Sequence, residues 1–140
     1  MSLNYKFLLL LLSLLFIATE SSAADWKKLY NGYFDASRVT KTGRGTIIIY
    51  TKTILSRERH SADNVSIPYE NYSHTMSQIE YNCDIGEYRY LSVHDYSNDN
   101  TAVSNTNPNP NFEPALPETV AEYNLNVVCS YAKRSKPKKK

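Results

Sequence analysis

Three histidines are the side chains in this sequence best suited to acid–base catalysis or metal binding. His60 lies in a polar stretch, whereas His74 and His94 lie in two stretches with the character of β-strands. Neighbouring residues on a strand point to opposite faces, so His94 and Asp95 cannot form a catalytic dyad by themselves. The sequence also contains no GxSxG, HExxH or phosphate-loop motif. We therefore predict no catalytic residues, no cofactor and a protein that is not an enzyme.

A two-histidine surface site is the one metal-binding alternative. If the chain folds into a hairpin with its turn near Gly86, His74 and His94 come close to facing each other across the two strands. We favour two ordinary strand histidines instead, because the sequence places no third ligand beside them. We accordingly predict no bound metal.

The two cysteines, Cys83 and Cys129, indicate a covalent cross-link. The N-terminus has the pattern of an export signal, described below, and an even pair of cysteines in an oxidising compartment most simply forms one disulfide. Closing a loop of about 45 residues contributes on the order of 4 kcal/mol by the chain-entropy model. The alternatives are a metal pair or a redox pair, which the lack of CxxC spacing and of a His–Cys cluster disfavours.

Tyrosine is frequent, with 12 residues in 140. It suits binding surfaces because it offers a large, rigid area with a polar tip. Tyr88 and Tyr90, in the strand after the expected turn, are our candidate binding residues. We expect the binding residues to lie on the sheet face that the helix leaves uncovered. The alternative is that tyrosines fill the core, which we favour for most of the twelve.

A second candidate binding segment is the cluster of lysines that closes the chain, which comprises Lys136, Lys138, Lys139 and Lys140. Such a cluster can contact anionic lipid, lipopolysaccharide or sulfated glycans, each lysine adding roughly 1 kcal/mol near a charged surface. The alternative, which we favour, is a solvated terminus that aids solubility.

The first 24 residues have the pattern of a secretory signal peptide. A charged region ends at Lys6, an apolar run extends from Phe7 to Ile17, and small residues lead to Ala24. The apolar run has 11 residues, well short of the roughly 20 that span a bilayer, so a membrane anchor is the weaker alternative. We predict cleavage after Ala24 and no transmembrane segment in the mature chain. Export leads to the periplasm, the cell surface or the medium.

Charge divides the mature chain into a domain at 25–131 and a basic tail at 132–140. Residues 25–129 contain 9 basic and 13 acidic side chains, whereas residues 130–140 contain 6 basic and none acidic. The folded part therefore lacks the positive face that nucleic acid requires, and we predict no nucleic-acid partner.

The elements that would position these residues are organised around the stretch from Ser77 to Tyr96. Apolar and polar residues alternate up to Cys83, a turn follows at Asp84–Glu87, and a second strand returns to Tyr96. Further strands are expected at 26–30, 33–35 and 46–55, with Trp26 and Leu29 in the core. Residues 56–72 and 97–111 are expected to form long polar loops.

A helix is predicted near the C-terminus. Pro117 and Glu118 suit its start, although Val127–Cys129 could also be a strand by propensity. Helical spacing gives an inward stripe of Val120, Tyr123, Asn124, Val127, Val128 and Tyr131. The fold class predicted is α+β: an antiparallel sheet of about five or six strands, one C-terminal helix packed on it, and one disulfide.

An ordered set of short motifs resembles the surface-adhesin protein E-like family of Gram-negative bacteria. The set comprises Asp25-Trp26, Tyr33–Asp35, the Gly43–Leu55 turn and strand, Ile79–Cys83, Tyr88–Leu91, Pro117–Val120 and Cys129. The resemblance implies a non-enzymatic envelope protein with a disulfide-fixed helix. The founding member binds host extracellular-matrix and serum proteins and can dimerise, so the resemblance adds these proteins and a second copy of the chain as candidate partners. The sequence departs from the founding member in lacking a lipid-attachment cysteine near the cleavage site.

Three functional hypotheses follow. The first is an envelope module that binds host matrix or serum proteins or an anionic polymer. The second is a structural or assembly component of the periplasm with no host ligand. The third, which we favour least, is an inhibitor or an enzyme with an unrecognised site.

Overall fold

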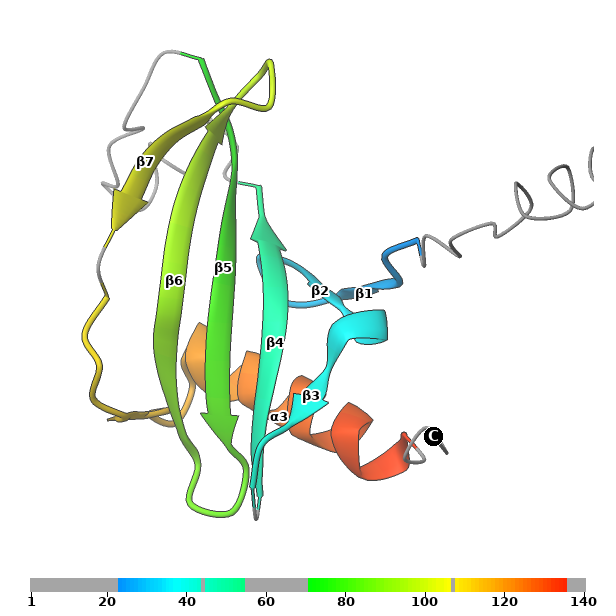
Figure 1. Cartoon of the computed structure of the whole chain (residues 1–140). Helices are drawn as coiled ribbons and strands as arrows, with labels where there is room; N and C mark the ends of the chain where they lie inside the picture. The colour runs from blue at the N-terminus through cyan, green and yellow to red at the C-terminus, as the bar shows by residue number, and fades with distance from the viewer. Residues whose placement is uncertain (1–22, 44, 55–70, 107, 136–140) are drawn as a thin grey trace, which may run out of the picture.

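The structure, a computed structural model, describes residues 23–43, 45–54, 71–106 and 108–135. These residues form one antiparallel sheet whose main strand order is β1-β2-β4-β5-β6-β7, with a single long helix behind its lower half (Figure 1). The main strands are β1 (Trp26–Lys28), β2 (Gly32–Asp35), β4 (Thr46–Thr53), β5 (Tyr72–Asn82), β6 (Glu87–Ser97) and β7 (Ala102–Thr106).

Three shorter elements complete the sheet layer. Strand β3 (Thr40–Lys41) pairs with β4, strand β8 (Glu113–Pro114) pairs with β6, and the 3-10 helix η1 (Ala36–Arg38) follows β2. The helix is α3 (Val120–Arg134). The described residues thus form an eight-stranded sheet with one C-terminal helix, which confirms the predicted fold class and adds the short strands to it.

The hairpin of β5 and β6 lies at the centre of the sheet, as predicted. Gly86 adopts a φ of 73° in its turn, a conformation that glycine takes without strain, and its N–H donates to the Asn82 carbonyl. The pairing changes register between Gln78 and Ile79, because Gln78 lies opposite Ser92 and Ile79 lies opposite Tyr90. Leu91 is therefore an extra residue on β6, which is the arrangement of a β-bulge.

The core lies between α3 and the sheet. Leu125, Val128, Cys129 and Ala132 form the buried face of the helix, and Phe34, Ile47, Ile49, Ile79 and Tyr81 meet it from the strands. Ile49 and Val128 are both 0% exposed. The spacing of the buried helix residues follows the 3.6-residue repeat of an amphipathic helix.

The disulfide joins this helix to the central hairpin. The sulfur atoms of Cys83 and Cys129 are bonded, with 5.7 Å between the Cα atoms. Cys83 lies in the turn between β5 and β6, so the second half of α3 is attached covalently to one end of the sheet. The predicted cross-link is confirmed.

The helix starts later than predicted. Glu118 has a φ of +62°, which is incompatible with a helix, and the N-cap is Thr119. The Thr119 hydroxyl accepts a hydrogen bond from the Glu122 N–H, while the Glu122 carboxylate accepts one from the Glu118 N–H. This arrangement is a variant of the capping box, in which the carboxylate reaches the residue before the N-cap, and it fixes the start of the helix at Val120.

The predicted inward stripe of the helix is also wrong in part. Val120 and Tyr123 are 39% and 50% exposed, whereas Leu125 and Ala132, which were not in the stripe, are buried. Cys129 must face the sheet to reach Cys83, and this requirement rotates the helix away from the predicted face. Val128 is the one residue of the predicted stripe that is fully buried.

Two predictions about the strands need correction. Trp26 is 38% exposed, because β1 is the edge strand of the sheet, although Leu29 is buried as predicted. Residues 97–111 are not all loop, because they contain β7, which extends the sheet beyond β6. Asp99 makes this possible by accepting hydrogen bonds from the Ser97 hydroxyl and the Thr101 N–H in the turn before β7.

The predicted loop at 56–72 lies outside the described residues except for its last two positions, and Tyr72 already belongs to β5. The signal peptide, apart from Ala23 and Ala24, and Lys136–Lys140 also lie outside them. Among the described helices, none is long and apolar enough to cross a membrane.

Candidate functional site

The helix-facing side of the sheet changes in character halfway along two adjacent strands. On β4, the sequence passes from Ile47 and Ile49 to Thr51 and Thr53 on the same face. Thr51 lies opposite Ser77 on β5, where Ile49 lies opposite Ile79. Apolar pairs under the helix are therefore followed by a hydroxyl-bearing pair where the helix begins, and such pairs cannot pack as tightly against apolar helix residues.

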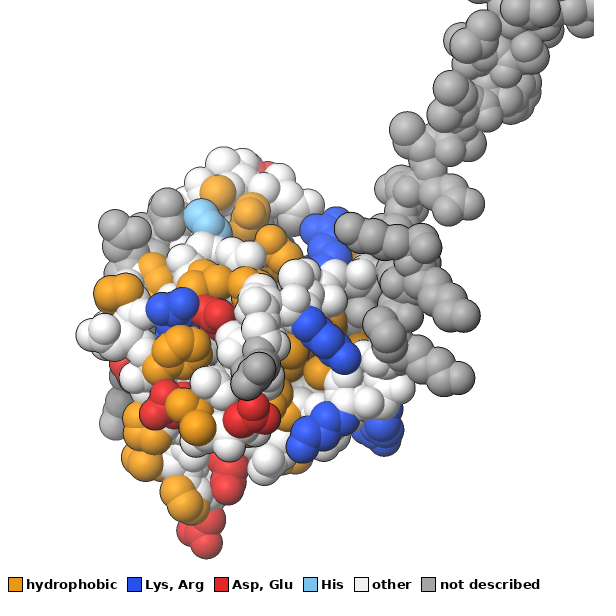
Figure 2. Space-filling model, turned by 60° about the horizontal axis from the view of Figure 1, so that its bottom comes forward, with side chains coloured by type: hydrophobic (Ala, Val, Ile, Leu, Met, Phe, Trp, Pro, Cys, Tyr) orange, Lys and Arg blue, Asp and Glu red, His pale blue; other side chains and the backbone are white. Residues whose placement is uncertain are grey.

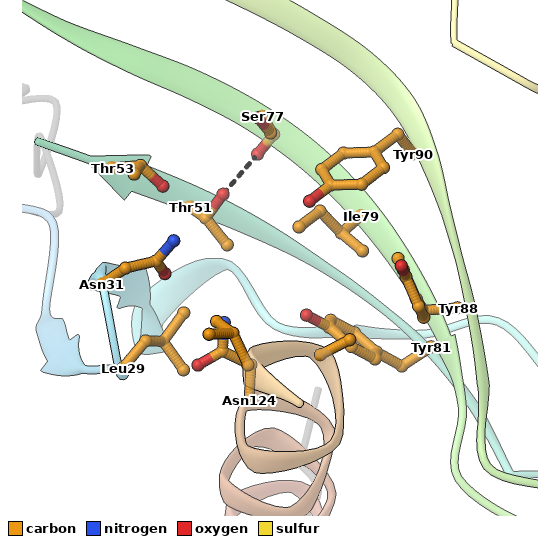
Figure 3. A pocket seen from close by; sticks show the side chains of 12 residues that line it. Leu29, Asn31, Thr51, Thr53, Ser77, Ile79, Tyr81, Tyr88, Tyr90 and Asn124 are labelled. Atoms are coloured by element: carbon orange, nitrogen blue, oxygen red, sulfur yellow. Dashed lines mark hydrogen bonds between the residues drawn. The ribbon is translucent and has the colours of Figure 1, made fainter. Parts of the chain in front are cut away.

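A pocket of about 300 Å³ occupies this part of the molecule. We call it the hydroxyl pocket, and Figure 3 shows its lining side chains between the first turn of α3 and strands β4, β5 and β6. Its lining consists of Leu29, Asn31, Thr51, Thr53, Ser77, Ile79, Tyr81, Tyr88, Tyr90, Val120, Ala121 and Asn124.

The hydroxyl of Tyr81 is the most deeply buried polar group of the pocket. The Tyr81 side chain is 2% exposed, and its hydroxyl points into the pocket (Figure 3). It makes no hydrogen bond to any other residue in the described part of the chain. Leaving such a group without a partner costs about 1–3 kcal/mol. Burial raises the pKa of Tyr81 strongly, so the hydroxyl is neutral and keeps its proton to donate.

Tyr90 and Tyr88 continue the aromatic wall from β6. The two rings meet edge to face with centroids 6.0 Å apart, and Tyr88 is 6.2 Å from the Tyr81 ring. The Tyr90 hydroxyl also points toward the pocket interior. Burial is the main cause that raises the pKa of Tyr90, with smaller contributions from Tyr88 and Glu113. Both predicted tyrosines thus line one site, but on the helix side of the sheet and not on the uncovered side.

Asn124 supplies an oriented amide to the pocket. Its Oδ1 accepts a hydrogen bond of 3.0 Å from the backbone N–H of Tyr30. This bond turns the amide nitrogen toward the strands, where Figure 3 shows it facing the pocket. Tyr30 is held in turn by an edge-to-face contact with Tyr123, at a centroid distance of 5.7 Å. The pocket therefore has a fixed donor on its helix side.

Among the described residues, those that line the pocket carry no charge. The nearest charge with a resolved effect on it is Glu113, which contributes to the raised pKa values of Tyr88 and Tyr90. The view from below in Figure 2 shows acidic side chains mostly on one side and basic ones mostly on the other, with hydrophobic groups between them. The electrostatic environment of the pocket is thus neutral to slightly negative.

The histidines do not form a site in the described residues. His74 lies opposite Tyr96 and His94 opposite Met76, so the two are diagonal and not paired. The His74 ring is stacked on Tyr96 at 5.0 Å and is 7% exposed. Burial, followed by the charge of Lys52, lowers its pKa. Within the described ranges, no three His, Cys, Asp or Glu residues gather as metal ligands would, and His60 falls outside these ranges.

Two buried carboxylates elsewhere are already used by their neighbours. Glu80 Oε2 accepts from Arg89 Nε at 2.7 Å, and the same guanidinium donates to the Pro110 carbonyl and lies over the Phe112 ring at 4.5 Å. This ion pair holds residues 110–112 against the sheet on the face opposite the helix. Its geometry indicates a structural role, because both charges are satisfied within the protein.

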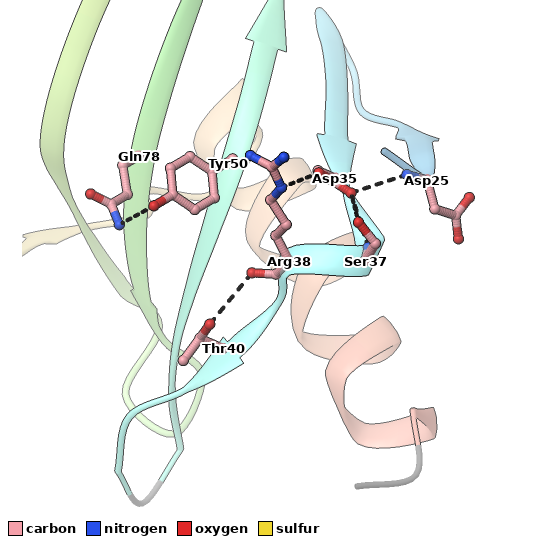
Figure 4. Close-up of polar contacts among 7 residues, drawn as sticks. All are labelled: Asp25, Asp35, Ser37, Arg38, Thr40, Tyr50 and Gln78. Atoms are coloured by element: carbon pink, nitrogen blue, oxygen red, sulfur yellow. Dashed lines mark hydrogen bonds and ion pairs between the residues drawn. The ribbon is translucent and has the colours of Figure 1, made fainter. Parts of the chain in front are cut away.

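The second carboxylate, Asp35, is 1% exposed and closes the start of the domain (Figure 4). It accepts hydrogen bonds from the Asp25 N–H, the Ser37 N–H and the Ser37 hydroxyl, and pairs with Arg38. Burial acts to raise its pKa, but the bonds from Ser37 and Asp25 and the charge of Arg38 outweigh this, so the net pKa is lowered.

Sequence reasoning found Tyr88 and Tyr90 but missed Tyr81, Ser77 and Asn124 as members of the site. The signal for them was present as hydroxyl residues replacing isoleucines at alternate positions along β4 and β5. The lysine cluster at Lys136–Lys140 lies outside the described residues, and its role stays a prediction.

Comparison with known protein families identifies the family of this chain. Residues 23–130 match the family model for surface-adhesin protein E. Two solved structures of Haemophilus influenzae protein E share the fold. Its crystal form II gives a TM-score of 0.59 at 10% identity and covers 78% of this chain and 90% of that chain. The other gives 0.51 at 12% identity, with 83% and 90% covered.

A search of curated protein sequences found no match. At 10–12% identity the solved structures establish similarity of fold alone. The sequence match to the family model, in contrast, extends over most of the chain and includes both cysteines and the whole hydroxyl pocket. The chain therefore belongs to the surface-adhesin protein E family of adhesin-like surface proteins.

Proposed function

We propose that this protein is a non-enzymatic binding module of the Gram-negative envelope and that the hydroxyl pocket is its binding site. The observation that carries the proposal is the chemistry of the pocket lining, which offers neutral donors, neutral acceptors and aromatic surface. It lacks an acid–base pair with matched pKa values and a cluster of metal ligands, in the part of the chain that the structure describes. Such a lining suits recognition better than turnover.

The partner class comes from the family. An adhesin-like surface protein needs a ligand outside the cell. We propose that this ligand is present on host extracellular-matrix or serum proteins. Export through a signal peptide at residues 1–24 and a mature domain at 25–131 are parts of the same proposal. A homodimer is a further expectation, which light scattering on the purified mature chain tests.

The binding experiment uses the mature chain 25–140 and immobilised matrix and serum proteins. Tyr90→Ala removes a 40% exposed ring from the pocket rim and should weaken binding at least tenfold. Tyr33→Ala is the matched control, because Tyr33 is a comparably exposed tyrosine on the opposite face of the sheet, where Lys52 is its partner on β4. Equal binding by both variants and the unchanged protein would exclude the pocket as the site.

A second binding surface is the tail at 132–140, proposed for anionic glycans or lipids because of its lysines. Truncation after Ser135 removes the lysine cluster and keeps the whole of α3, including the buried Ala132. It should abolish binding to heparin or to anionic vesicles while leaving pocket binding intact. Retention of heparin binding by the truncated chain would exclude this role.

The alternative function is a periplasmic structural or assembly component without a host ligand. Protease treatment of intact cells separates the two. A surface adhesin is cut by the protease, whereas a periplasmic protein is protected until the outer membrane is opened.

A further inference from the structure

We propose that the hydroxyl pocket binds a neutral sugar ring, so that the domain recognises an uncharged glycan. This inference rests on the proposed function, because it takes the pocket as the site of a binding module and adds the chemistry of the ligand. Four properties of the pocket lead to it: buried unpartnered hydroxyls, an oriented amide, apolar patches between the polar groups, and the absence of charge.

The buried hydroxyls are the first property. Tyr81 is 2% exposed and Ser77 is 7% exposed, and neither side-chain hydroxyl has a hydrogen-bond partner among the described residues. The Tyr81 hydroxyl points into the pocket (Figure 3). Each hydroxyl both donates and accepts, so its best partner is a group that does the same. A sugar hydroxyl is such a group, and it can replace the water that otherwise occupies a polar cavity.

The second property is the placement of donors on the helix side. Asn124 has its oxygen occupied by the Tyr30 N–H, so its amide nitrogen is the group that remains for a ligand. Asn31 adds a second carboxamide from the turn between β1 and β2. Amide donors on one side of the pocket thus face hydroxyls on the strand side. A ring that carries hydroxyls around its edge can form hydrogen bonds to both sides.

The third property is the apolar surface between the polar groups. Leu29, Ile79, Val120 and Ala121 line the same pocket, together with the tyrosine rings. A sugar ring presents hydroxyls at its edge and C–H groups on its faces, so it can satisfy both kinds of surface at once. The volume of about 300 Å³ lies at the lower end of the range of about 300–1,000 Å³ for small-molecule sites, which suits one ring.

The fourth property, the absence of charge, decides between ligand classes. A sulfated or sialylated glycan would bring a negative charge to a site whose lining, as far as the structure describes the chain, has no cation and has Glu113 nearby. A quaternary ammonium would prefer aromatic faces around it, yet Tyr81 and Tyr90 present their hydroxyl tips to the interior. These two observations disfavour anionic and cationic ligands, and a neutral sugar ring is the ligand class that remains.

The experiment measures binding of the mature chain 25–140 to an array of neutral, sialylated and sulfated glycans. The neutral glycan that gives a signal is then titrated in solution as its methyl glycoside, with choline as the cationic control. We expect binding to neutral members only. Tyr81→Phe, which removes one buried hydroxyl and no ring, should weaken the affinity at least tenfold.

Tyr50→Phe is the matched control for this variant. It makes the same chemical change on the opposite face of the sheet, where the Tyr50 hydroxyl accepts from Gln78 Nε2 at 3.1 Å (Figure 4), and it should bind like the unchanged protein. Binding restricted to charged glycans, binding to choline, or equal affinity of Tyr81→Phe and the unchanged protein would overturn the inference.

A parallel measurement separates this inference from the proposed function. The mature chain is tested against matrix and serum proteins before and after enzymatic removal of their glycans. Loss of binding on deglycosylation supports a glycan ligand. Equal binding before and after, with no signal from neutral glycans, overturns the glycan inference and leaves the binding function standing. Absence of binding to every protein and every glycan overturns both.

Discussion

The two ends of the interface between helix and sheet are built from the same helix and the same strands, yet they differ in the polarity of the side chains between helix and sheet. At one end, which we call the closed end, Ile47 and Ile49 pack against Val128, and the Cys83–Cys129 bond fixes the contact. At the other end lies the hydroxyl pocket, where Thr51 and Ser77 replace isoleucines and a cavity remains.

This contrast shows how a small domain keeps a cavity open. Apolar burial favours filling any gap between a helix and a sheet, so a hollow interface persists only if the helix is held in place elsewhere. The closed end does this covalently through Cys129, while the Thr119 cap and the bond from Tyr30 to Asn124 hold the beginning of the helix. Stability is thus concentrated at one end, and the polar groups available to a ligand lie at the other.

The largest effect should follow from breaking the closed end. Replacing both cysteines by serine opens a loop of 46 residues in sequence separation, which by the chain-entropy model lowers the free energy of unfolding by about 4 kcal/mol. Urea unfolding of the mature chain measures it. Reducing agent should destabilise the unchanged protein and leave the double serine variant unaffected. A loss below about 1 kcal/mol would show that packing alone holds the helix.

The next largest effect on stability should come from a substitution in β4, where two neighbouring positions on the same face can be compared. Ile49→Thr places a hydroxyl in a site that is 0% exposed and should cost about 3 kcal/mol in the free energy of unfolding. Thr51→Val, two residues along, removes a hydroxyl whose only hydrogen bond to a described residue is 3.5 Å long. It should change stability by less than about 1 kcal/mol. Similar losses at both positions, in urea titrations, would remove the distinction between the two ends.

These two ends were not equally readable from the sequence. The disulfide and the central hairpin were predicted, because an even cysteine pair in an exported chain and a glycine turn between alternating strands are local signals. The helix was predicted to exist, but its first residue depends on the positive φ of Glu118. The side of the helix that faces the sheet depends on the position of Cys129. Neither can be obtained from helical periodicity.

The pocket was harder to predict because it depends on strand register. Tyr88 lies opposite Tyr81, and the extra residue Leu91 sets which later residues of β6 share their face. A shift of one residue would turn every side chain of a strand to the other face. The sequence left this register open, and for that reason it did not show which face of the sheet each tyrosine takes.

A smaller effect concerns the start of the helix beside the pocket. Thr119→Ala removes the hydroxyl that caps the Glu122 N–H and should lower stability by about 1 kcal/mol. Thr119→Ser keeps the hydroxyl and should behave like the unchanged protein. Hydrogen exchange should become faster in the first helical turn of the alanine variant and stay slow around Val128. Uniformly faster exchange would mean that the two ends of the helix open together.

Acid should weaken the domain through Asp35, which follows Phe34, a core residue packed edge-on against Tyr131 of the helix. The folded pKa of Asp35 is lowered, so its stabilisation is complete above the ordinary value of 3.8 and declines as the pH falls through the folded pKa. Unfolding measured from pH 6 to pH 2 should show a decline below about pH 4. Asp35→Asn should reduce this decline, and an unchanged pH profile would contradict the assignment.

The proposed cleavage after Ala24 would strengthen the Asp35 interaction. It would convert the Asp25 N–H, which donates to Asp35 Oδ1 at 3.1 Å, into the positively charged amino terminus of the mature chain. A charge-assisted hydrogen bond is stronger than a neutral one. A chain that begins at Asp25 should therefore be more stable than one that begins at Ala23, and equal stability would argue against this pairing.

The smallest effect on stability should come from Tyr81→Phe, and its sign is informative. Tyr81 extends across the boundary, because its ring packs in the core and its hydroxyl lies in the pocket. Removing a buried hydroxyl without a partner abolishes its desolvation cost, so we expect a change between zero and a gain of about 1 kcal/mol. Tyr50→Phe makes the same change where the hydroxyl has a partner in Gln78 and should lower the free energy of unfolding by about 1 kcal/mol.

A loss for Tyr81→Phe as large as for Tyr50→Phe, measured by urea unfolding, would mean that the folded protein already satisfies the hydroxyl of Tyr81. The open end would then be a packed part of the core, and the contrast between the two ends would fail.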